Sequence, residues 1–297
     1  MPPPMENKTL IILGMHRSGT SLITNWLHKC GLQVGETLME AGVGNKEGHF
    51  EDTEFYKMHM EILRDNNLNE SGIINQKVNY LSSYHKEKIK GIIRVKNKLF
   101  GQWGWKDPRT CLFLKHYREL LPQAYYLVVV RDYHSVVVSL LKRTMAELDL
   151  HYDTQKGPLS RLAWYKVRRK LFYHRFCRKH ASYFLNSWIF YNENILENIK
   201  NMSDKRFLIV DYDMLKTKDK DVLTFLNTNW HFSLNYSKFS GVYKDSLLSK
   251  SFDVEDYIDD KLLIGKANGV MKKLMNYAPD IRHECNAPSF NAEVLLS

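Results

Sequence analysis

Hydrophobic and polar residues alternate along this chain in blocks whose lengths predict strands and helices in turn. Short apolar runs predict buried strands at Lys8–Leu13, Tyr125–Val130 and Phe207–Val210, with shorter pieces at Leu32–Val34 and Trp103–Trp105. The run Tyr125–Val130 is the strongest of these, because its residues all favour extended backbone, as in a central strand of a parallel sheet.

Longer stretches, in which apolar residues recur every three or four positions, predict helices. They are Thr20–Cys30, a helix capped by Asp52 or Thr53, residues 84–100, Thr110–Leu121, Ser135–Met145, Arg161–His180, Tyr183–Lys200, Asp219–Asn227 and Lys261–Tyr277. Strands that alternate with helices indicate an α/β fold with a central, mainly parallel sheet flanked by helices in three layers.

The length of 297 residues suits one large domain with a substantial core. We expect a single domain over residues 1–297, with its core at 8–230. Within it we expect a basic helical insertion at 151–182. Because the pattern weakens after about residue 235, residues 235–297 are expected to form a C-terminal extension.

The charge balance favours acidic ligands. An excess of 43 Lys and Arg over 33 Asp and Glu gives a net charge of +10. Arg161–His180 holds eight of these cations and no acid. This segment is either an amphipathic helix with a solvated basic face, or an acceptor surface for an anionic glycan, a lipid headgroup or an acidic peptide. Nucleic acid is not expected as a partner, because no base-reading motif accompanies the charge.

The chain carries no apparent signal for export or for spanning a membrane. Its N-terminus lacks the apolar core of a signal peptide, and no stretch approaches the ~20 apolar residues of a spanning helix. The four cysteines are far apart, fit no metal-binding spacing and suggest no disulfide framework. We therefore expect a cytoplasmic protein without a transmembrane segment.

The first strand leads into a turn suited to binding an anion. The apolar run ends at Gly14, four residues follow, and Gly19-Thr20-Ser21 opens a helix whose backbone N–H groups favour negative charge. The spacing is that of a P-loop, but Thr20 stands where nucleotide triphosphatases have lysine. Arg17 is the cation of this loop, so we expect a phosphate-like group other than the γ-phosphate of ATP.

Two further polar segments follow predicted strands. One is Gly104–Arg109, which contains Lys106, and the other begins with Arg131 and continues to Ser139 and Arg143. The carboxyl ends of parallel strands share one edge of a sheet, where such folds bind ligands. Ser139 and Arg143 lie four residues apart on one helix face, within reach of Arg131, so this set would clamp a second phosphate away from the first loop. Taken singly, each segment could be a turn, a surface ion pair or a helix-surface hydroxyl.

These motifs together resemble those of sulfotransferases that use 3′-phosphoadenosine 5′-phosphosulfate (PAPS). The run Gly14–Leu22 is similar to their 5′-phosphosulfate loop, in the variant with Arg before Ser-Gly-Thr of the bacterial and protein-tyrosine branches. Trp105–Arg109 resembles their Lys-Asp-Pro segment, and Leu127–Arg143 their 3′-phosphate segment. Phe207–Leu215 is similar to a further family strand, although Asp211 replaces its usual arginine. The resemblance covers roughly residues 8–145 and 183–230.

The resemblance implies a P-loop-like fold and a site for PAPS as donor, without a metal. It implies that the 5′-phosphosulfate is bound by Arg17, Ser18, Gly19, Thr20 and Ser21, and the 3′-phosphate by Arg131, Ser139 and Arg143. Arg17 and Lys106 are then expected to be catalytic, with Lys106 neutralising charge on the bridging oxygen. Such transfer is mostly positioning and charge stabilisation.

The acceptor needs a general base, and three residues remain candidates. Glu36 falls near the point where related branches carry a glutamate, and Glu51 follows an aromatic residue as in the bacterial branch. His49 is the third. The acceptor itself is expected to be a hydroxyl or amine on a carbohydrate or other small metabolite, anionic ones included.

Two other functions stay open at this point. A P-loop nucleotide or small-molecule kinase would use Leu208–Asp211 as a Walker-B-like strand, but the missing loop lysine counts against it. A non-catalytic basic module would bind nucleic acid or a membrane surface.

Overall fold

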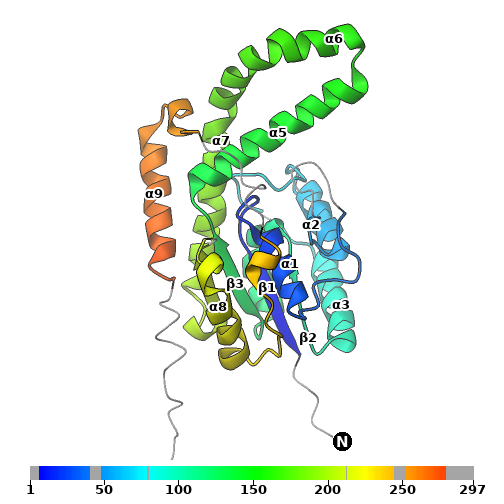
Figure 1. The fold of residues 1–297 in the computed structure, drawn as a ribbon. Helices are drawn as coiled ribbons and strands as arrows, with labels where there is room; N and C mark the ends of the chain where they lie inside the picture. The colour runs from blue at the N-terminus through cyan, green and yellow to red at the C-terminus, as the bar shows by residue number, and fades with distance from the viewer. Residues whose placement is uncertain (1–6, 41–47, 79, 212, 244–251, 279–297) are drawn as a thin grey trace, which may run out of the picture.

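Four parallel strands form the centre of the molecule. The computed structural model describes residues 7–40, 48–78, 80–211, 213–243 and 252–278. The strands are β1 (Lys8–Leu13), β2 (Gln102–Lys106), β3 (Tyr125–Val130) and β4 (Phe207–Asp211). They lie in the order β2-β1-β3-β4, and every neighbouring pair is parallel. The expected fold class, a three-layer α/β structure with a parallel sheet, is confirmed (Figure 1).

Helices connect these strands and cover both faces of the sheet. The α-helices are α1 (Thr20–Lys29), α2 (Thr53–Asp65), α3 (Ser83–Leu99), α4 (Leu114–Leu120), α5 (Tyr133–Gln155), α6 (Pro158–Ala163), α7 (Arg169–Ile199), α8 (Leu215–Asn229) and α9 (Lys261–Met275). Short turns of helix are η1 (Pro108–Phe113), η2 (Trp164–Arg168), η3 (Asp204–Arg206), η4 (Phe239–Gly241) and η6 (Glu255–Tyr257).

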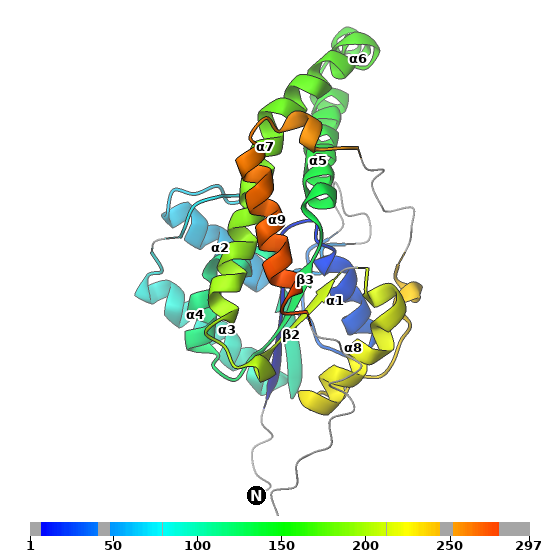
Figure 2. The ribbon, with the colours of Figure 1, turned by 90° about the vertical axis from the view of Figure 1, so that its left-hand side faces the viewer.

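Alternate residues of each strand enter two separate cores. Leu10 and Ile12 point into the smaller core, which α1 and α8 cover, whereas Ile11 and Leu13 point into the larger one. The larger core takes in α2, α3, α4, α5, α7 and α9. Figure 2 shows α1 and α8 on one side of the sheet and α2, α3 and α7 on the other. Burial on both faces explains why the strands are almost continuously apolar.

The segment Leu32–Val34 does not form the strand that its apolar residues suggested. Within this segment only Gln33 makes a bridge, a single parallel one to Trp103 of β2. Gly31 and Gly35 flank the segment with φ of 101° and 140°. Because both turns need conformations that favour glycine, too few extended residues remain between them for a ladder. The glycine-rich loop after it lies partly outside the described residues.

The helices predicted at Arg161–His180 and Tyr183–Lys200 are not separate. Most of this length is the single helix α7, and residues 161–168 belong to α6 and to the π turn η2. Neither glycine nor proline interrupts residues 178–185, so nothing ends the helix there. The helix predicted at Ser135–Met145 likewise continues to Gln155, as part of α5.

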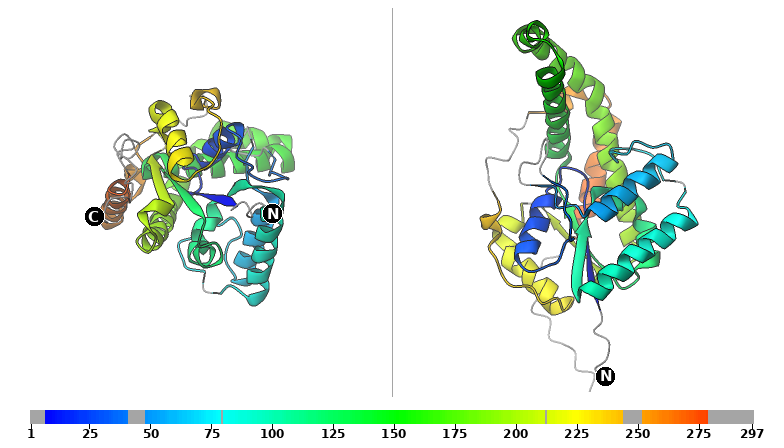
Figure 3. Two further views of the ribbon diagram at one scale, coloured as in Figure 1. Left: turned by 90° about the horizontal axis from the view of Figure 1, so that it is seen from below. Right: turned by 90° about the vertical axis from the view of Figure 1, so that its right-hand side faces the viewer.

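The end of α5, α6, η2 and the start of α7 form a helical hairpin that projects from the domain. We call this hairpin, Glu147–Ser182, the arm; it contains the residues expected as a basic insertion. Figures 1 and 3 show it rising beyond the carboxyl ends of the strands. α9, from the expected C-terminal extension, packs along α7 through Leu263, Ala267, Val270 and Leu274 (Figure 2). None of the helices in the described residues is both long and apolar enough to cross a membrane.

The contact between β1 and β2 is unusually close at Gly104. This residue is paired with Leu10, and a Cβ atom on Gly104 would lie 2.2 Å from the Leu10 carbonyl oxygen. Only glycine allows the two strands this register and spacing. The same strand ends two residues later at Lys106, so the pairing sets the position of that side chain.

Candidate functional site

The loop after β1 has the conformation of an anion-binding turn. Gly14 has φ of 152°, and a Cβ there would lie 2.7 Å from the Val129 carbonyl oxygen. Arg17 adopts a left-handed φ of 70°, which is uncommon for a residue with a side chain. Gly19 is the N-cap of α1 and has no side chain to cap the first-turn amides. These N–H groups, including those of Thr20 and Ser21, are therefore placed to bind an anion.

Arg17 joins this loop to α5 through its guanidinium and to the end of β3 through its backbone carbonyl. Its Nε donates to Ser139 Oγ at 2.9 Å, while Arg131 Nη1 donates to the Arg17 carbonyl at 3.1 Å. Burial and then the positive charges of Arg143 and Arg131 lower the pKa of Arg17 to about 10. The clamp expected away from the loop is thus contiguous with it, and the positive charges of the three arginines repel one another.

Lys106 reaches the same loop from β2. Its buried Nζ donates to Ser21 Oγ at 3.1 Å and to Glu51 Oε1 at 2.7 Å. Backbone contacts hold Glu51, whose carbonyl accepts from Met39 N at 2.8 Å. A lysine and a carboxylate thus stand side by side at the start of α1, where a group held by the loop would meet both.

Arg109 lies behind Glu51 and is held on several sides. Its Nη1 is 3.0 Å from Asp107 Oδ1 and 3.9 Å from Glu51 Oε2, and its guanidinium lies 4.7 Å from the Tyr56 ring centre. Burial acts to raise the pKa of Asp107, but Arg109 and His59 outweigh it and hold this pKa well below its usual range. Asp107 therefore stays ionised and fixes the turn that follows Lys106.

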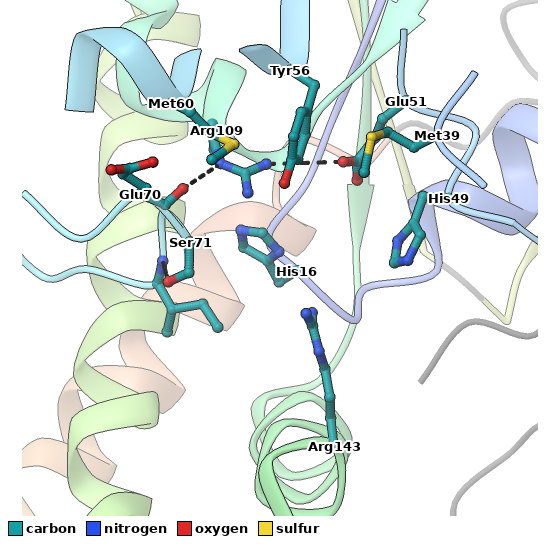
Figure 4. A pocket seen from close by; sticks show the side chains of 11 residues that line it. His16, Met39, His49, Glu51, Tyr56, Met60, Glu70, Ser71, Arg109 and Arg143 are labelled. Carbon is teal, nitrogen blue, oxygen red and sulfur yellow. Dashed lines mark hydrogen bonds and ion pairs between the residues drawn. The ribbon is translucent and has the colours of Figure 1, made fainter. Parts of the chain in front are cut away.

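A pocket of about 320 Å³ opens beside these groups. Its apolar wall comes from Met39, Met60 and Ile73, and its polar side chains come from His16, His49, Glu51, Tyr56, Glu70, Ser71, Arg109 and Arg143. In Figure 4 Arg143 points from α5 toward His16, and Arg109 lies between Glu70 and Glu51. The pocket combines an apolar wall with a larger number of polar and charged side chains, which suits a small polar molecule.

Both histidines of this pocket favour the neutral form. Burial, and next to it Arg109, lowers the pKa of His16 well below its ordinary value. Burial also lowers the pKa of His49, although Glu51 acts against it. Neutral imidazoles can accept a hydrogen bond, and His16 Nε2 is buried with no hydrogen-bond partner among the described residues.

Glu36 lies in a different cluster from Glu51. It pairs with the buried Lys96, whose Nζ also lies 2.8 Å from Asp52 Oδ2 and 2.9 Å from Glu54 Oε2. The three carboxylates could hold a metal ion by their spacing, but the Lys96 ammonium occupies the place of the cation. The structure thus brings Glu51 to Lys106 and the loop, and holds Glu36 on Lys96.

Asp211, at the end of β4, serves a turn. Its Oδ1 accepts from Asp213 N at 2.7 Å, and burial raises its pKa. β3 separates β4 from β1, the strand that leads into the loop.

The family model for sulfotransferases matches residues 9–230, three quarters of the chain. The chain belongs to the sulfotransferase family. This match includes every motif that resembled the family in sequence, and the expected family membership is confirmed. A search of curated proteins finds no match.

Solved structures of sulfotransferases share the fold. Sulfotransferase STF9 from Mycobacterium avium is 13% identical, with a TM-score of 0.52 over 92% of this chain and 77% of that one. The sulfotransferase domain from the curacin biosynthetic pathway is 15% identical, with a TM-score of 0.49 over 92% and 99%. Family and fold together support sulfotransferase activity for this chain.

Several residues of the site had no role that could be predicted from the sequence. Arg109 belongs to the Trp105–Arg109 motif and His16 to the loop after β1, but the spacing of neither motif indicated that the two residues would line one pocket. Tyr56 is on α2, where its neighbours Phe55 and Met58 gave the signal of an ordinary amphipathic helix. The buried partner of Asp107, His59, lies on the same helix and would have needed the three-dimensional contact to be found.

Proposed function

We propose that this chain transfers the sulfuryl group from PAPS to the hydroxyl or amine of a small acceptor. The observation that carries the proposal is the contact of Arg17 with both Ser139 and Arg131, which gathers cations from two strand ends around one loop. PAPS carries anionic groups on both the 5′ and the 3′ oxygen of its ribose, whereas ATP has no 3′-phosphate. A cluster of cations that extends from the loop to α5 therefore fits PAPS better than ATP.

The loop would bind one anionic group of the donor and the arginines near α5 the other. The amides of Thr20 and Ser21, with Arg17, would bind the 5′-phosphosulfate, as Ser18 and Gly19 shape the turn. Arg131, Ser139 and Arg143, the last of which also lines the pocket, would bind the 3′-phosphate. Binding of anions would relieve the repulsion that lowers the pKa of Arg17.

Glu51 is the base that the geometry favours. Its carboxylate borders the pocket and contacts Lys106, so an acceptor in the pocket would stand between Glu51 and the loop. Glu51 would accept the acceptor's proton as the acceptor oxygen or nitrogen bonds to sulfur. The bond from sulfur to the 5′-phosphate oxygen breaks, and Lys106 would neutralise the charge left on that oxygen.

The acceptor would occupy the pocket next to Glu51. Its volume of about 320 Å³ suits a small metabolite or a single sugar unit. His16, His49 and Arg109 would supply its polar contacts, and Met39 and Met60 its apolar ones.

Calorimetry with adenosine 3′,5′-bisphosphate and with ADP tests the donor. We expect the bisphosphate to bind at least about tenfold more tightly than ADP, and Arg131→Ala to remove this preference, because a charge-assisted hydrogen bond is worth about 1.5–3 kcal/mol. Equal or tighter binding of ADP would overturn the proposal. Magnesium-dependent hydrolysis of ATP would favour a kinase instead.

A further inference from the structure

The tip of the arm carries a row of exposed aliphatic side chains. Leu159 and Leu171 expose 83% and 73% of their surface, and Leu162 and Val167 lie between them, also exposed. Soluble proteins rarely leave several such residues together on one projecting element, and such patches mark interaction sites.

The π turn η2 aligns these residues on one face. The Arg169 N–H bonds to the Trp164 carbonyl, five residues before it, so that residues five apart stack across the turn. In an ordinary α-helix, residues five apart point about 140° away from each other. The π turn therefore brings Leu162 and Val167 together, and the ordinary spacings on either side add Leu159 and Leu171 to the row.

A contact with α5 holds the π turn in place. Trp164 Nε1 donates to Asp149 Oδ1 at 2.9 Å, and Arg169 makes a bidentate pair with the same carboxylate. The Trp164 ring also stacks on Tyr152 at 4.1 Å between centres. Trp164 and Arg169 are five residues apart, so the turn that lets both reach Asp149 also turns the aliphatic row outward.

Cations flank this row. Lys166, Arg168 and Lys170 are exposed, and none of them makes an ion pair with any residue in the described ranges. Over the whole arm, Glu147–Ser182, nine Lys and Arg face three acids, which accounts for more than half of the net charge of +10. An apolar row between unpaired cations is complementary to a surface that is anionic outside and apolar beneath.

We propose that the tip of the arm docks on an anionic lipid bilayer, with the aliphatic row among the acyl chains and the flanking cations at the lipid headgroups. A second copy of the chain fits less well, because a symmetric contact through this face would bring two positively charged tips together. Nucleic acid would use the cations but leave the leucines and valine without a role. The proposal does not depend on the proposed transfer reaction.

Vesicle flotation with the full-length protein tests the docking. We expect at least about tenfold more protein on vesicles that contain about one-third phosphatidylglycerol than on pure phosphatidylcholine. Val167→Ser/Leu171→Ser and Lys166→Glu/Lys170→Glu should each lower binding to the anionic vesicles at least about tenfold. Unchanged circular dichroism would show that the variants remain folded.

Helix α3 supplies matched controls. Val95 and Leu99 have the same identities and spacing as Val167 and Leu171, and expose 52% and 56% of their surface. Arg94 and Lys98 match the charged pair. Val95→Ser/Leu99→Ser and Arg94→Glu/Lys98→Glu should leave vesicle binding within about twofold of the wild type, because α3 lies on the domain body and not on the arm.

Three results would overturn the proposal. Absence of binding to anionic vesicles, or an equal loss in the α3 variants, would remove the arm as a membrane contact. An oligomer seen by light scattering that the arm variants dissolve would assign the tip to a second copy. Salt-dependent binding of DNA that the Lys166→Glu/Lys170→Glu variant loses, with no vesicle binding, would assign it to nucleic acid.

Discussion

Two buried lysines, Lys96 and Lys106, each hold a glutamate, and their surroundings differ in kind. Lys96 is surrounded by the carboxylates of Glu36, Asp52 and Glu54. Lys106 has one carboxylate, Glu51, and the hydroxyl of Ser21 at the mouth of the anion-binding loop. The first lysine is fully neutralised by the protein, whereas the second shares a single acid and faces the place of a ligand.

The difference separates a structural ion pair from a candidate catalytic one. Asp52 is the N-cap of α2 and accepts from Glu54 N at 2.9 Å, so the Lys96 cluster ties α3 to the start of α2. Lys106 and Glu51 connect β2 to the pocket and the loop. A glutamate near a lysine is therefore not enough to indicate a base, and the other neighbours of that lysine decide it.

The largest expected effect is at Glu51, the proposed general base. Glu51→Gln should lower kcat roughly a thousandfold, since general-base catalysis contributes about 10²–10⁴ and the amide cannot take a proton. Steady-state sulfation with the acceptor checks this. Glu36→Gln is the matched control and should stay within about threefold of the wild type, because Glu36 pairs with Lys96. The opposite ranking of the two variants would assign the base to Glu36.

Replacement of Lys106, which contacts Glu51, should have the next largest effect on kcat. Lys106→Met should lower kcat about 10²–10³-fold, the range found when one group that stabilises transition-state charge is lost. Lys106→Arg should recover part of the rate, since it keeps a cation near Ser21 and Glu51. Single-turnover rates with saturating donor measure both. A normal rate for Lys106→Met would show that the bridging oxygen does not need this cation.

Replacement of Lys96 should lower the stability of the fold and leave the rate of transfer nearly unchanged. Lys96→Met should lower the free energy of unfolding by about 3 kcal/mol, because the buried Asp52 then loses its cation while Glu36 and Glu54 stay partly solvated. Urea denaturation measures this loss. In the folded fraction kcat should stay within a few-fold of the wild type. A large fall in kcat without a loss of stability would contradict the division between the clusters.

The smallest expected effect is a pH dependence of the contribution that Lys96 makes to the free energy of unfolding. Although burial of Lys96 acts to lower its pKa, the hydrogen bonds that its ammonium donates to Asp52, Glu36 and Glu54 raise this pKa above the value of 10.5 for the unfolded chain. The unfolded state then loses its proton first as pH rises, so the stabilisation is present below pH 10.5 and falls above it. The gap in unfolding free energy between wild type and Lys96→Met should narrow by up to about 1.4 kcal/mol per pH unit there. Urea melts at pH 8 and 11 check it; a constant gap would contradict the raised pKa.

The sequence predicted features that depend on neighbouring residues. The strands β1, β3 and β4 follow from continuous apolar runs, and a cap at Asp52 or Thr53 follows from their place before an amphipathic helix; in the structure Asp52 is the cap. The loop motif at Gly14–Ser21 was readable for the same reason. These signals span few residues, so no long-range contact is needed to interpret them.

Features that depend on distant contacts could not be predicted in this way. Glu36 and Glu51 were equal candidates because Lys96, 60 residues from Glu36, had the pattern of an ordinary helix lysine. The π turn could not be predicted because Asp149 holds it in place, and Asp149 lies 15 and 20 residues from its partners Trp164 and Arg169. In both cases ion pairs between residues far apart in the sequence decide the geometry, and the fold sets which residues pair.

The close pairing at Gly104 has a consequence for inherited variation. A single added methyl group would push β2 off its neighbour against the Leu10 carbonyl, and Lys106 would move with it. Such a change would displace Lys106, the proposed charge-neutralising lysine, from Ser21 and Glu51. A glycine-to-alanine allele at this codon is therefore expected to impair both the pairing of β1 with β2 and the placement of that lysine.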